Sequence, residues 1–63
     1  MNRQETLDVC LKSVVETMTD LYSRAGVSEA DKSSYLEQGN ESFKIIAINI
    51  YEKLVEVGVI TND

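Results

Sequence analysis

The fold is decided by the stretch Phe43-Lys44-Ile45-Ile46-Ala47-Ile48-Asn49-Ile50-Tyr51-Glu52-Lys53-Leu54-Val55-Glu56-Val57. On a helical wheel with about 100° per residue, one face of this stretch collects Phe43, Ile46, Ala47, Ile50, Leu54 and Val57. Ile48 and Val55 widen the apolar arc to about 200°, and Ile45 lies further round still. This is more apolar surface than one neighbouring helix covers. We therefore expect a helix that needs a partner beyond its own chain.

A second amphipathic pattern precedes this stretch. Its apolar side chains fall within one arc of roughly 140°, and they are Leu7, Cys10, Leu11, Val14, Val15, Met18, Leu21, Tyr22 and Ala25. Spacing by four residues predicts the exposed ion pairs Asp8–Lys12 and Asp20–Arg24. Gly26 is typical of a helix end, because glycine readily adopts the left-handed conformation found there. The pattern predicts a helix over residues 3–25 and a turn at 26–28.

The segment that joins the two patterns begins with a cap signal and contains one ambiguous glycine. Ser28 is expected to cap a helix whose first turn contains acidic residues, which the helix dipole favours. A break at Gly39-Asn40, with Asn40 capping a new helix, is one interpretation. Leu36 and Gly39 share the face of Phe43, however, and this favours one helix over residues 29–57, straight or bent at Gly39. Residues 58–63 are expected to form a short tail after Gly58.

These elements predict a single all-α domain, an antiparallel hairpin of two long helices. A chain of 63 residues buries only roughly 60% of its unfolded surface and needs a disulfide, a metal or oligomerisation for stability. One cysteine and no histidine exclude an internal disulfide and the usual zinc site. We therefore expect a homo-oligomer, preferably a dimer that forms a four-helix bundle. The predicted oligomer or partner interface comprises Tyr35, Gly39, Phe43, Ile45, Ile48, Tyr51, Val55 and Val59.

No residue pattern indicates catalysis. Cys10 lies on the apolar arc of the first helix and is expected to be a small buried side chain. Without histidine, the common Cys–His nucleophile pair cannot form. The carboxylates have surface spacing, and the Glu-x-x-His motif of carboxylate-bridged metal sites in bundles does not occur. We expect a non-enzymatic protein without a metal or a cofactor.

Charge and hydropathy narrow the function further. Eleven acidic and six basic residues give a net charge of −5, which disfavours nonspecific nucleic-acid binding. No stretch approaches the roughly 20 apolar residues of a membrane span, and the first residues do not resemble a signal peptide. These features favour a cytoplasmic interaction protein that binds another protein, and the acidic surface favours a partner with a basic one. Regulators, adaptors and inhibitors, including those that phages encode, are of this type.

Two other functions remain open. One is that an oligomer holds a small anionic ligand or a nucleotide through Lys12, Arg24 or Lys32 together with helix N-termini. A DNA-binding regulator would use residues 31–50 as a helix-turn-helix, but its second helix would present Ile45, Ile48 and Glu52 where base reading needs polar donors. Protein binding is therefore the preferred function.

Overall fold

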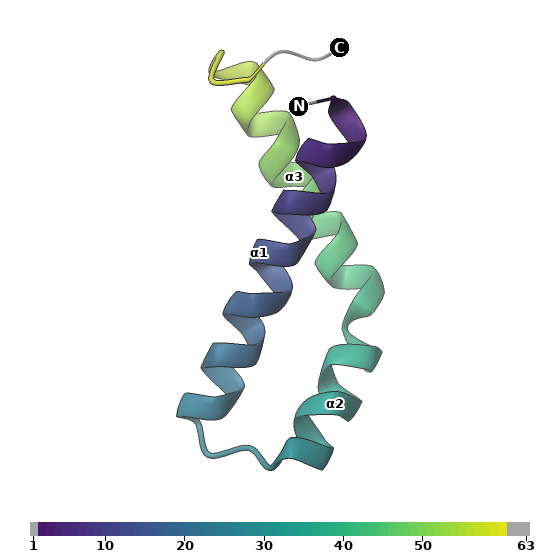
Figure 1. Ribbon diagram of the computed structural model, residues 1–63, viewed down its shortest axis with the longest axis vertical. Helices are drawn as coiled ribbons and strands as arrows, with labels where there is room; N and C mark the ends of the chain where they lie inside the picture. Colours follow the sequence, from purple (N-terminus) through teal and green to yellow (C-terminus); the bar gives the residue numbers. More distant parts are fainter. Residues whose placement is uncertain (1, 61–63) are drawn as a thin grey trace.

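The computed structural model describes residues 2–60 and consists, over that range, of three α-helices without strands. Helix α1 spans Arg3–Arg24, α2 spans Glu29–Gln38 and α3 spans Asn40–Glu56. The chain descends along α1 and returns along α2 and α3, so that the start of α1 and the end of α3 lie at the same end of the molecule (Figure 1). The all-α class is confirmed. The expected long second helix, however, is divided into α2 and α3.

The helix ends follow local signals in the sequence. Asn2 caps α1 through a reciprocal pair of hydrogen bonds with Glu5, whose backbone N–H donates to Asn2 Oδ1 at 2.8 Å. Gly26 has a φ of +79°, and the backbone N–H of Val27 donates to the carbonyl of Tyr22 at 3.0 Å. This is the glycine-terminated end that the sequence predicts.

The predicted start of α2 and the predicted end of α3 are also found. The Ser28 hydroxyl accepts a hydrogen bond from the backbone N–H of Asp31 at 3.2 Å, as expected for the cap of α2. Gly58, with a φ of +82°, follows the end of α3. The predicted tail is described as far as Ile60, which packs against the core, and residues 61–63 lie outside the described range.

The division of the long helix at Gly39 has a visible cause. Gly39 stays in the right-handed region, with a φ of −84° and a ψ of −2°, but its ψ departs from the helical value. The ring of Phe43 lies on this glycine, so that an added Cβ would be 2.6 Å from Phe43 Cζ. The glycine makes room for a core side chain of its own chain. At this joint α3 turns away from the line of α2 and crosses α1 (Figure 1).

The core lies where α1 and α3 cross. Its buried members are Cys10 and Val14 from α1 with Phe43, Ala47 and Tyr51 from α3. Partly buried side chains surround them: Leu7, Leu11, Val15, Met18, Leu36, Leu54, Val55 and Ile60. None of the described side chains is less than 2% exposed. The core is therefore a single thin layer between two helices.

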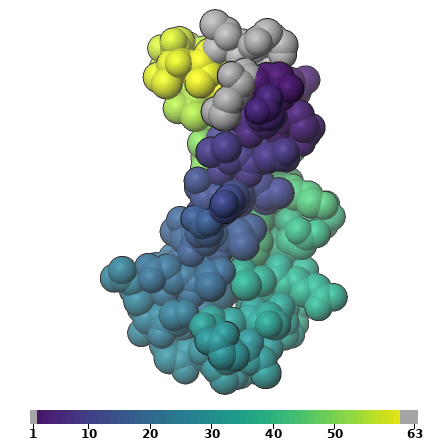
Figure 2. Space-filling view, in the orientation of Figure 1, coloured from purple at the N-terminus to yellow at the C-terminus, as the bar shows by residue number. Residues whose placement is uncertain are grey.

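The shape is correspondingly elongated. The molecule measures 40 × 18 × 17 Å, and Figure 2 shows the narrow body from one side. Its radius of gyration is 13.5 Å, whereas a compact domain of this length has about 11 Å. A larger share of each helix is thus exposed than in a closed bundle.

Candidate interaction surface

The isoleucines of α3 are exposed on both sides of the core. The exposed fractions are 60% for Ile45, 43% for Ile46, 44% for Ile48 and 40% for Ile50. The core uses only the stripe Phe43, Ala47 and Tyr51, whose members are four residues apart and therefore share one side of the helix. All four isoleucines lie outside that stripe. Ile46 and Ile50 line one surface and Ile48 lines another, and the two surfaces differ in composition.

The first surface, here called the Ile50 face, lies on one side of the crossing. Two adjoining hollows of about 290 and 400 Å³ share Ile46 and Ile50 and form its centre. Its apolar members are Val14, Met18, Ile46, Ile50, Leu54 and Val57, and its border consists of Ser13, Thr17, Asn49 and Lys53. The border contains one charged residue, Lys53, and no acidic residue. Val57, at 69% exposed, extends the face beyond the end of α3.

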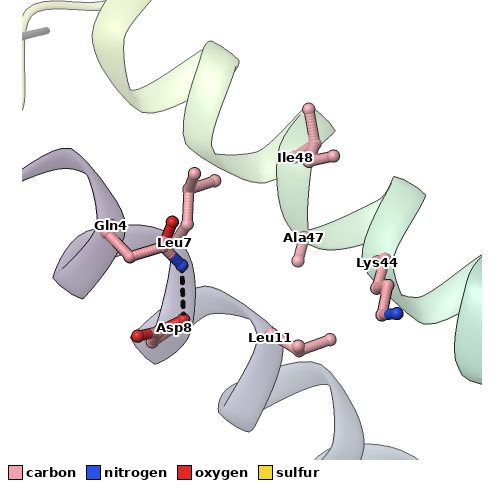
Figure 3. A pocket seen from close by; sticks show the side chains of 7 residues that line it. All are labelled: Gln4, Leu7, Asp8, Leu11, Lys44, Ala47 and Ile48. Carbon is pink, nitrogen blue, oxygen red and sulfur yellow. Dashed lines mark hydrogen bonds between the residues drawn. The ribbon is translucent and has the colours of Figure 1, made fainter.

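The second surface, here called the Ile48 groove, lies between α1 and α3 on the other side. It has a volume of about 230 Å³, and its walls and floor are Leu7, Leu11, Ala47 and Ile48, with Gln4, Asp8 and Lys44 at the rim. In Figure 3, Leu11 of α1 extends toward α3, where Ala47 faces the space between the helices. Ala47 is the most deeply buried of these residues and forms the floor.

The charges at the rim of the groove differ from the predicted pairing. The sequence predicts an ion pair of Asp8 with Lys12, but Lys12 is directed to Glu16, at 4.0 Å. Asp8 instead accepts a hydrogen bond from the neutral amide of Gln4 at 2.8 Å (Figure 3). A neutral donor leaves the negative charge of Asp8 uncompensated. The Asp20–Arg24 pair, in contrast, forms as predicted at 2.7 Å.

The residues of the predicted interface lie in different environments. Tyr35, Ile45, Ile48 and Val59 are exposed, and Val55 is partly buried beside the core. Phe43 and Tyr51 are core residues of the single chain. They therefore hold α3 against α1 and are not open to a second molecule. Gly39 lies under the Phe43 ring, so its small size already serves packing within the chain.

Sequence reasoning missed the residues at the centre of the Ile50 face. Ile46, Ile50 and Val57 share the broad arc of Phe43 on the wheel and were expected to face the core. They are exposed because the crossing with α1 buries only the stripe of Phe43, Ala47 and Tyr51, and these side chains lie beside that stripe. The same crossing leaves Leu21 of α1 51% exposed although it lies on the predicted core arc. The only signal in the sequence was the width of the arc itself.

Tyr35 takes part in a contact that closes the lower end of the molecule. The rings of Tyr22 and Tyr35 meet edge to face, with centroids 5.6 Å apart. Beside them, the ammonium group of Lys32 donates to the Ser23 hydroxyl at 2.9 Å and to a Glu29 oxygen at 2.6 Å. These contacts join α1 to α2. The predicted role of Tyr35 as an interface anchor stays a prediction.

The groups that could carry other chemistry are dispersed. Cys10 is buried at 7% exposed, as the sequence predicts. Among residues 2–60, no group of three or more potential metal ligands comes together. The three bases considered for an anionic ligand each pair with a carboxylate of their own helix: Lys12 with Glu16, Arg24 with Asp20 and Lys32 with Glu29. Within the described range, none of the helices has the length and apolar character needed to cross a bilayer.

Comparison of the chain with protein-family models, with curated proteins and with solved structures finds no match in any of the three. The two apolar surfaces on either side of the α1–α3 crossing are therefore the features from which a function can be argued.

Proposed function

We propose that this protein is a non-enzymatic interaction module that works as a homodimer, in which the Ile50 faces of two copies pack together and the dimer binds another protein. The observation that carries the proposal is the exposure of large apolar side chains on one face of α3. Ile46 is 43% exposed, Ile50 is 40% exposed and Val57 is 69% exposed. Soluble single chains rarely expose a continuous apolar patch of this kind unless it binds another molecule.

The Ile50 face is the better of the two surfaces for a second copy. Each copy carries a net charge of −5, so two copies repel each other wherever acidic residues would meet. The residues that line the Ile50 face include no acid, and Lys53 at its border is paired with Glu56 at 3.1 Å. Packing two such faces would place two pairs of helices around one core, as in a four-helix bundle.

A second copy also supplies what the single chain lacks. The core of one copy contains five buried apolar residues in a single layer. Ile46, Ile50 and Val57 adjoin this core, and each is at least 40% exposed. Completing their burial would stabilise the fold by about 1 kcal/mol for each side chain. Folding and association would then be coupled, and the melting temperature would rise with protein concentration.

Sedimentation equilibrium at micromolar concentration tests the proposal. The wild-type protein is expected at twice the chain mass of 7.1 kDa. Ile50→Asp should give a monomer, because it places a charge in the centre of the contact. Ile45→Asp is the matched control, since it makes the same change at a more exposed isoleucine of α3 outside the Ile50 face. A wild-type monomer, or equal loss of the dimer in both variants, would refute the assignment.

A second measurement needs no variant. The chain contains five isoleucines, at positions 45, 46, 48, 50 and 60, whose methyl groups can be followed separately by NMR. On dilution, the signals of Ile46 and Ile50 should shift as the dimer dissociates, whereas those of Ile45 and Ile48 should stay. The reverse pattern would place the contact between copies on the other side of α3.

A further inference from the structure

The Ile48 groove is open in the single chain and remains open in the proposed dimer. Ile48 and Ile50 are two residues apart on α3, so their side chains point about 160° apart around the helix. A second copy seated on the Ile50 face therefore does not reach the groove. We infer that the Ile48 groove binds an amphipathic helix of another protein, with apolar side chains in the groove and basic side chains toward its rim.

The shape of the groove suits a helix. Its two walls come from helices, and its floor is the small side chain of Ala47, which lies between Leu7, Leu11 and Ile48. A volume of about 230 Å³ admits large apolar side chains but is open to the surface along its length. An amphipathic helix fills such a groove with side chains at positions i, i+3, i+4 and i+7. The groove has few polar groups and so little to orient a small ligand.

Charge identifies the partner as basic. Along the outer edge of α3 the order is Glu41, Ile45, Ile48 and Glu52, with spacings of four, three and four residues that keep them on one side of the helix. On the α1 wall, Asp8 has only the neutral Gln4 donor. The base at the rim, Lys44, is paired with Glu41 at 3.4 Å. Glu52 lies one turn beyond Ile48, outside the residues that line the groove, and makes no ion pair among the described residues. The charges that have no opposite partner on and beside the groove are therefore negative.

The same charges argue against a second copy in this groove. Another copy would bring its own net charge of −5 toward Asp8 at the rim and toward Glu52 beside the groove. A basic helix is attracted to both carboxylates, and such charge pairs chiefly raise the association rate and select the partner. The inferred helix binding rests on the proposed function in one respect: the proposed dimer contact, on the Ile50 face, leaves the Ile48 groove free.

Titration with three synthetic peptides of about 18 residues tests the inference, with the isoleucine methyl signals of the full chain as readout. The first peptide is an amphipathic leucine–lysine helix, the second replaces each lysine by glutamate, and the third replaces each leucine by serine. The leucine–lysine peptide should shift the Ile48 signal and leave Ile46 and Ile50 unchanged, and its affinity should fall as salt rises. The other two peptides should bind at least about tenfold more weakly.

Charge reversal beside the groove provides the matched variants. Glu52→Lys should weaken the leucine–lysine peptide by about fivefold. Asp20→Lys, an identical charge change outside the groove at the other end of α1, should leave affinity within about twofold. Both positions are exposed, and far-UV circular dichroism will report the fold of each variant. Binding that shifts Ile46 and Ile50 instead, equal binding of the glutamate peptide, or equal weakening in both variants would overturn the inference.

The two proposals fail separately. A chain that sediments as a monomer but binds the leucine–lysine peptide at Ile48 removes the proposed dimer and keeps the groove. A chain that sediments as a dimer without any response of Ile48 removes the groove and keeps the dimer.

Discussion

Substitution of Gly39 by alanine distinguishes packing within one chain from packing between chains. The alanine Cβ would lie 2.6 Å from Phe43 Cζ and 3.0 and 3.1 Å from its two Cε atoms. Carbon atoms in contact prefer about 3.5–4.0 Å, so the ring would have to move by about 1 Å. Phe43 is only 6% exposed and packs in the cluster with Cys10, Val14 and Ala47. The ring therefore cannot swing away without disturbing the core.

The expected magnitude is the difference between two opposing terms. Forcing an extra methyl group against a packed core costs about 1–3 kcal/mol. Replacing glycine by alanine in a helix gains at most about 1 kcal/mol, and less here because Gly39 lies at the junction of α2 and α3. We expect a net loss of about 1 kcal/mol, which for a chain of this length lowers the melting temperature by roughly 7 °C. Helix propensity alone predicts a higher melting temperature for Gly39→Ala.

Thermal unfolding followed by far-UV circular dichroism is the assay, at one fixed protein concentration because association shifts the midpoint. Phe43→Leu removes the ring atoms that a Cβ at position 39 would meet. In that background Gly39→Ala should be neutral or stabilising. A rise in melting temperature in the wild-type background would refute the packing argument. An equal loss in both backgrounds would indicate that Gly39 is needed for something other than the Phe43 ring, such as close approach of a second copy.

Three further outcomes follow from local contacts. Ser28→Ala should lower stability by about 1 kcal/mol, measured by urea denaturation, because the Asp31 backbone N–H loses the acceptor that caps α2. A double-mutant cycle with Tyr22→Leu and Tyr35→Leu should give a coupling of about 0.5–1.5 kcal/mol in the same assay, since the rings meet edge to face; additive effects would contradict the contact. Cys10 should react with iodoacetamide far more slowly in the folded protein than in urea, as followed by mass spectrometry, because the thiol is buried.

The ends of the helices could be predicted from the sequence because they depend on neighbouring residues. Gly26 and Gly58 adopt the left-handed conformation that the end of a helix requires, and Ser28 caps α2. The preference for one helix over residues 29–57 is wrong at Gly39, and the reason is physical. The backbone there stays in the right-handed region, and the interruption accompanies the contact between Gly39 and the Phe43 ring. Periodicity alone gives no information about such a contact.

The exposed residues were harder to predict because exposure depends on where two helices cross. The helical wheel correctly indicates that the apolar arc of α3 is wider than the surface that α1 can cover, and Ile45 and Ile48 are exposed. It could not identify the centre of the buried stripe, which lies along Phe43, Ala47 and Tyr51. If that centre were moved around the helix by less than a quarter of a turn, Ile50 would be buried and Tyr51 would be exposed.

The spacing of the core residues separates the requirements of folding from those of binding. The contact with α1 needs the stripe of Phe43, Ala47 and Tyr51, and the partly buried Leu54 extends it. Four isoleucines between positions 45 and 50 lie outside that stripe, and each is at least 40% exposed. Polar residues at those positions would keep the stripe intact and reduce the exposed apolar surface that promotes aggregation. The presence of isoleucine there, with acidic residues near one pair and none lining the other, is explained if the two sides of α3 meet two different molecules.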